Sequence, residues 1–166
     1  GASTISGTAS FDSTDDAITD SGTLAITGQT TLDSGTANLT LDQAASTFGT
    51  LLITGADVSV VENAATDLGT STVSGTLAID SQAAIINTGG ALAITGNATF
   101  TNNDGSNAAI TLNNASNAFS GTVTFTTDNG SAVTIVDTTA FDIKALTVAS
   151  LSVTTGGTLT DSGTLT

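Results

Sequence analysis

Carboxylates are the main groups in this chain that could perform acid–base or metal chemistry. Fifteen Asp and Glu residues accompany one basic residue, Lys144, and there is no His, Cys or Tyr. The missing His excludes a serine triad and leaves few general bases or electrophiles. A glycosidase-like carboxylate pair remains conceivable, and Asp15–Asp16 is the only adjacent pair. The internal repeat described below aligns this pair with Ala83 and Ala84, so we expect no enzyme activity, no catalytic residue and no cofactor-binding residue.

Calcium binding is the second chemistry that these acids allow, because Ca²⁺ takes oxygen ligands. The leading candidates are Asp12, Asp15 and Asp16 in "DSTDD", followed by "NNDG" at 102–105 and "TDNG" at 127–130. The calcium-loop patterns G-G-x-G-x-D and D-x-[DN]-x-[DN]-G are both missing. Asp and Asn in turns also hydrogen-bond their own backbone without any metal. We therefore expect no resident metal and keep a calcium-stabilised stalk as the alternative.

The charge balance limits the partners. A formal net charge of −14 argues against binding to nucleic acid, whose phosphates need Lys and Arg, and against binding to anionic membrane surfaces. No apolar run approaches the ~20 residues that span a bilayer, so we expect no membrane insertion. No basic segment leads into an apolar one, so any export signal is expected outside this sequence.

The sequence repeats itself, which indicates building units and not one unique site. Five segments recur in the same order at offsets that grow from about 67 to about 75 residues. The matched ranges are 4–13 with 72–81, 18–32 with 85–100, 39–53 with 110–125, 58–68 with 133–143, and 18–24 with 159–165. We predict one solenoid segment over 1–166, with approximate repeats at 1–17 (partial), 18–84, 85–158 and 159–166 (partial).

Within each repeat the apolar residues alternate with small polar ones, as in Leu77 and Ile79 or Val133 and Ile135. This period of two is typical of half-buried strands. Turn residues such as "DSG" and "NTGG" separate the strands. The sequence therefore predicts an all-β fold without convincing helices.

A parallel β-solenoid fits this pattern better than a sandwich or a propeller. Repeats differ by insertions at turns, and inward positions keep their size, so that Phe48 is expected to stack over Phe119. We expect about seven to nine coils of roughly 20 residues, making a rod roughly 35–45 Å long. Parallel crossovers favour a right-handed β-helix. Asn114 and Asn117 are expected to form amide ladders between coils.

The ends of the sequence resemble interior repeats: "GASTISG" aligns with 69–75 and "TDSGTLT" with 20–25. Neither carries a polar cap, although an open solenoid end exposes apolar side chains and unpaired backbone groups. We therefore expect this segment to stack on neighbouring repeats or on other copies of itself, end to end.

The segments "LNNASNAFSGTVTF" and "VTIVDTTAFDIKALTVASLSVTTGGTLTDSGTLT" resemble the strand repeats of large bacterial surface proteins, namely filamentous-haemagglutinin-like adhesins and autotransporter passenger regions. The matching residues are Asn117, Phe119, Gly121, Val123, Gly157, Leu159, Asp161, Gly163 and Leu165. Lys144 departs from the pattern, since family members often have a Gly-rich stretch there. The resemblance implies a secreted, non-catalytic structural or adhesive repeat at the cell surface, facing host or matrix surfaces. A carbohydrate-binding β-helix is the other alternative.

Overall fold

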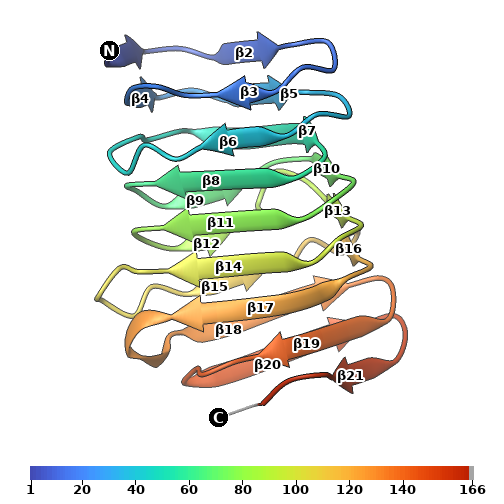
Figure 1. Ribbon diagram of the computed structural model, residues 1–166. Helices are drawn as coiled ribbons and strands as arrows, with labels where there is room; N and C mark the ends of the chain where they lie inside the picture. The colour runs from blue at the N-terminus through green and yellow to red at the C-terminus, as the bar shows by residue number, and fades with distance from the viewer. Residues whose placement is uncertain (165–166) are drawn as a thin grey trace.

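The computed structural model describes residues 1–164, apart from the side chains of Asn129 and Ala145. These residues form 21 short strands and one 3-10 helix, Asp128–Gly130. The strands stack in successive coils along one axis (Figure 1), and the pairs run parallel from β1–β4 at one end to β19–β21 at the other. The predicted all-β, parallel solenoid is confirmed. Leu165, in the last partial repeat, lies outside the described residues.

Three sheets form the walls of the rod. The two-stranded sheet contains β1 (Ser3–Ile5) and β4 (Leu24–Ile26). The eleven-stranded sheet contains β2 (Ala9–Asp12), β5 (Thr30–Asp33), β7 (Thr50–Gly55), β9 (Thr66–Leu68), β10 (Ser71–Val73), β12 (Ile85–Ile86), β13 (Leu92–Ile94), β15 (Ile110–Leu112), β16 (Ala118–Phe119), β18 (Ala132–Asp137) and β20 (Ser150–Thr155). The eight-stranded sheet contains β3 (Ile18–Thr19), β6 (Leu39–Leu41), β8 (Val58–Glu62), β11 (Leu77–Ser81), β14 (Ala98–Asn102), β17 (Thr122–Thr127), β19 (Phe141–Ala145) and β21 (Leu159–Asp161).

The number of coils follows from the strands of the eight-stranded sheet. Its strands follow one another from β3 to β21, which makes about seven turns and agrees with the lower end of the predicted range. The residues per turn vary: Thr50 lies opposite Asp67, 17 residues on, whereas Ala98 lies opposite Val123, 25 residues on. Turns absorb most of these differences, although the register of β17 with β19 shifts by one residue between Val123 and Thr124.

The core runs along the axis and is built by the alternation seen in the sequence. Leu77 and Ile79 are 2% and 1% exposed, while Ala78 between them faces outward. Aromatic rings gather in the second repeat, where Phe119 lies edge-on to Phe100 and Phe141 with ring centroids 6.1 and 6.3 Å apart. Phe125 stacks on Phe100 at 5.8 Å.

Equivalent strands of successive sequence repeats lie on different walls of the rod, each one wall further along the chain's path. The match of 4–13 with 72–81 places β2 of the eleven-stranded sheet on β11 of the eight-stranded sheet. Likewise, the match of 18–32 with 85–100 places β3 of the eight-stranded sheet on β12 of the eleven-stranded one. One repeat is therefore three coils plus one further wall. The expected stacking of Phe48 on Phe119 is wrong for this reason: Phe119 pairs instead with Ile94 of the preceding coil.

One wall ends in each repeat while its neighbour divides in two. In the first repeat, the wall of β1 and β4 ends at an isolated bridge between Ala25 and Thr47. The first residues of β7 then pair with β9 and its last residues with β10. In the second repeat, β16 is the last strand on its path. The first residues of β17 pair with β19, and the Thr127 hydroxyl donates to the Thr147 carbonyl at 3.2 Å. We call residues 46–55 the first junction and residues 117–127 the second.

Candidate functional sites at the turns, junctions and ends

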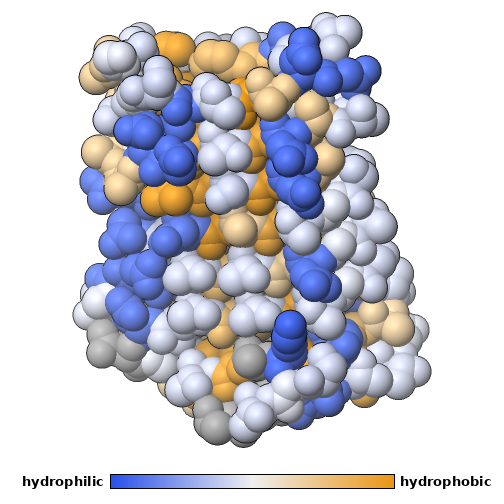
Figure 2. Space-filling model, in the orientation of Figure 1, coloured by the Kyte–Doolittle hydropathy of each residue, from blue (hydrophilic) through white to orange (hydrophobic). Residues whose placement is uncertain are grey.

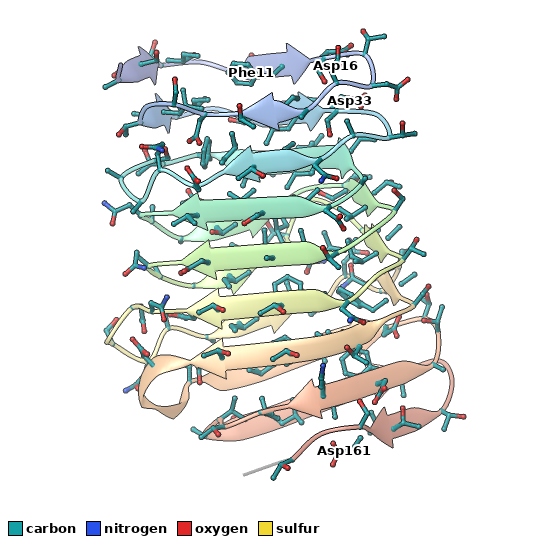
Figure 3. All side chains as sticks on the ribbon, viewed as in Figure 1. Phe11, Asp16, Asp33 and Asp161 are labelled. Atoms are coloured by element: carbon teal, nitrogen blue, oxygen red, sulfur yellow. The ribbon has the colours of Figure 1, made fainter. Side chains whose placement is uncertain are left out.

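The predicted calcium candidates lie in the turn after β2, where Asp12 and Asp15 each use one carboxyl oxygen to accept from a backbone amide. Asp12 accepts a hydrogen bond from the Thr14 amide at 3.0 Å. Asp15 accepts from the Thr36 amide of the next coil at 2.8 Å. Asp16 lies at the outer edge of the first coil (Figure 3), where its carbonyl oxygen accepts from the Ser13 hydroxyl. Among residues 1–164, no three acidic, His or Cys side chains converge in a way that could hold a metal ion.

The second cluster, 102–105, is also organised by turn hydrogen bonds. Asp104 accepts from the amides of Ser106 and Ala108, at 3.1 and 2.7 Å, and from the Ser106 hydroxyl at 2.7 Å. These bonds lower the pKa of Asp104, the Ser106 hydroxyl most strongly. Asn107 and Gly105 adopt positive φ angles of 67° and 64°, which Asn and Gly tolerate. The arrangement serves a tight turn.

The predicted amide ladder exists for Asn117 and not for Asn114. Asn117 is fully buried, and its Oδ1 accepts from Asn87 Nδ2 of the preceding coil at 2.8 Å. The same oxygen accepts from the Leu92 amide at 3.0 Å. Asn114 instead accepts from the Ser116 amide within its own turn, at 2.9 Å.

At each junction a backbone amide is capped by a buried acid that lies further along the chain. Where a wall ends, the next coil offers no carbonyl to that amide, so a side chain takes its place. Glu62 Oε1 accepts from the Phe48 amide at 2.8 Å, and Asp137 Oδ1 accepts from the equivalent Phe119 amide at 3.2 Å. Glu62 is 0% exposed and Asp137 is 2% exposed. Sequence reasoning missed both, although each follows two inward apolar residues in strict alternation, as in Val58–Val60–Glu62.

Both ends of the rod are open. At the first coil, a hollow of about 220 Å³ is lined by apolar side chains that include Phe11, Ile18 and Leu24. At the last coil, Leu151 and Leu159 are 38% and 53% exposed. Their strand neighbours one coil earlier are fully buried, because a further coil covers them.

The lateral surface differs from the ends. On the wall seen in Figure 2, hydrophilic side chains gather near the two ends of the strands, and paler and hydrophobic residues lie between them. Five of the six phenylalanines are buried, and Phe11 in the first coil is half-buried. The described residues contain no helix of the length and hydropathy that a membrane span requires.

The fold and its stacked coils define a β-solenoid repeat protein. The chain belongs to a family described as repeats of unknown function (DUF5649), which matches residues 1–54, 55–126 and 130–166. The boundary at 54/55 falls within β7 at the first junction, and the second match ends at 126, within β17 at the second junction. No curated protein matches the chain, and no solved structure matches it.

Proposed function

We propose that this segment is part of an extended, non-catalytic rod whose end coils pack against further coils, supplied by the same polypeptide or by a second copy. The observation that carries the proposal is the pair of open ends, where inward apolar positions are exposed although equivalent positions inside the rod are buried. Covering them with a coil removes apolar surface from water and pairs the free strand edges.

The resemblance to bacterial surface repeats extends this proposal to a secreted or cell-surface fibre with a structural or adhesive role, facing a host or matrix surface. The predominance of carboxylates over the single Lys144 supports a surface that repels nucleic acid and anionic lipid. The burial of the aromatic rings argues against the carbohydrate-binding alternative, because stacking on sugars needs exposed rings. The turn hydrogen bonds of Asp12 and Asp15 argue against the calcium alternative.

Sedimentation and electron microscopy of the 166-residue protein test the proposal. We expect association that rises with concentration and yields rods longer than one segment. Leu159→Lys, which places a charge on the open end, should suppress it. Thr99→Lys is the matched control, because Thr99 faces outward on β14 in the middle of the rod, and it should leave association unchanged. A monodisperse monomer at high concentration, with end-coil amides protected from hydrogen exchange, would overturn the proposal.

A further inference from the structure

Glu62 is the only glutamate of the chain, and its side chain is fully buried at the end of β8. One carboxyl oxygen caps the Phe48 amide, but the other, Oε2, has no hydrogen-bond partner among the described residues. The buried hydroxyl of Thr66 on β9 is also without a partner of normal hydrogen-bond geometry. A buried oxygen with no donor is costly when it carries charge.

The charges around Glu62 do not favour its ionised form. Burial raises its pKa from 4.5 to about 7, the carboxylate of Asp67 on β9 adds to the rise, and the Phe48 amide and Thr66 hydroxyl oppose it. No titratable residue lies on β6 or in the first junction. On β11 the carboxylate of Asp80 accepts from Asn103. Lys144 lies on β19, four strands further along the sheet from β8.

Asp137 at the second junction provides an internal contrast. Both of its oxygens accept from the Thr139 hydroxyl at 3.1 Å, and Oδ1 also accepts from the amides of Phe119 and Thr139, each at 3.2 Å. Both carboxyl oxygens of Asp137 therefore have hydrogen-bond donors, whereas Glu62 has one at Oε1 and none of normal geometry at Oε2. The two junctions therefore place the same functional group in opposite situations.

We propose that Glu62 is a proton-dependent latch at the first junction: the junction is closed when Oε2 carries a proton and loosens when the proton leaves. The proton removes the buried charge, and the resulting hydroxyl can donate to the Thr66 oxygen. In the ionised form the Thr66 hydroxyl opposes the pKa rise only weakly, because it makes no hydrogen bond of normal geometry. After loss of the proton, the charge draws water into the end of β8. The sign follows from linkage: the folded state holds the proton more tightly than the unfolded state, so junction stability is fully present below about pH 4.5 and declines as pH rises to about 7.

Because Glu62 is the only glutamate, a glutamate-selective ¹³C label reports on this one side chain. We expect its carboxyl resonance to titrate with a midpoint near neutral pH in the intact protein. A midpoint near the ordinary carboxyl value would overturn the latch. This measurement needs no variant and does not depend on whether rods assemble.

Hydrogen exchange at the two capped amides gives the second test. After correction for intrinsic rates, the protection of Phe48 should fall about tenfold between pH 6 and pH 8, whereas that of Phe119 should stay constant. Glu62→Gln should abolish the pH dependence at Phe48, and Asp137→Asn is the matched control that should leave it intact. Equal behaviour of the two amides in the unmodified protein, or an unchanged pH dependence in Glu62→Gln, would show that Glu62 is no latch.

Discussion

At the first junction a long acid, Glu62, caps Phe48, and the small Thr66 follows it in β9. At the second junction a shorter acid, Asp137, caps Phe119, and the sequence repeat puts Phe141 where the first repeat has Thr66. The larger neighbour accompanies the shorter acid. In both junctions, the amide at the end of a wall is bonded by a side-chain oxygen in place of a carbonyl of the next coil.

This comparison teaches that the position of the cap is conserved between the repeats while its chemistry is not. The same holds two residues before each capped phenylalanine. Ser46 Oγ accepts from the Leu24 amide at 3.1 Å, and Asn117 Oδ1 accepts from the equivalent Leu92 amide at 3.0 Å. Asn117 makes further bonds that Ser46 lacks, so the second junction is the more heavily bonded of the two.

The largest difference should appear on removing the junction phenylalanines. Phe119 is 1% exposed and contacts two other rings, whereas Phe48 is 7% exposed and lies in the repeat without an aromatic cluster. We expect Phe119→Ala to lower the free energy of unfolding by about 4 kcal/mol, and Phe48→Ala by less. Urea unfolding measures both. Equal losses would mean that the ring cluster adds no stability.

The next effect concerns the two polar side chains before these rings. Asn117→Ala leaves the Leu92 amide without a partner and leaves Asn87 Nδ2 with the Gly90 carbonyl alone. It also removes donors to the Leu112 and Val136 carbonyls. We expect a loss of about 3 kcal/mol in the free energy of unfolding, against about 1 kcal/mol for Ser46→Ala. A larger loss of unfolding free energy in Ser46→Ala than in Asn117→Ala would contradict this difference between the junctions.

A smaller effect is expected at the glycine corners, which the repeats share. Gly28 stacks directly on Gly7, and a Cβ at Gly28 would lie 2.6 Å from the Gly7 carbonyl oxygen. At Gly7 itself a Cβ meets nothing within 4 Å. We expect Gly28→Ala to cost about 2 kcal/mol of unfolding free energy and Gly7→Ala to be close to neutral. Thermal unfolding of the pair decides whether close coil contact, or chain flexibility alone, requires these glycines.

The smallest effect is expected at Asp57, an exposed residue beside the first junction whose equivalent in the second repeat is Ala132. Asp57 accepts from the Thr76 amide and hydroxyl at 2.8 and 2.9 Å, and the amide is the main cause of its lowered pKa. The stabilisation is present above the ordinary carboxyl pKa and disappears as pH falls through the lowered one. Asp57→Asn should lower stability at neutral pH slightly, because the carboxylate is exposed to solvent, and should reduce the acid dependence of stability. A large loss of stability at neutral pH would mean that the hydrogen bonds from Thr76 to residue 57 require a charged acceptor.

The alternation in the sequence was sufficient to predict the walls and the core, because period two places residues such as Leu77 and Ile79 on one side of a strand. The same reasoning, applied to Val58, Val60 and the residue after next, would have placed Glu62 inside the rod. The advance of one wall per repeat could not be predicted, since it depends on which strands pair across coils of 17 to 25 residues. The partner of Asn117 depends on the same strand pairing, so the sequence alone does not identify Asn87.

The advance by one wall has a consequence for a chain that carries several such repeats. Viewed from a fixed side, the outward face of a given repeat does not recur on the next repeat or on the one after it. It returns after three repeats, which is ten coils, or about 48 Å at about 4.8 Å per coil. A residue altered in every repeat would trace a helical line around the rod. A neighbour that approaches from one direction would meet it at widely spaced intervals, while neighbours on all three sides would meet it equally often.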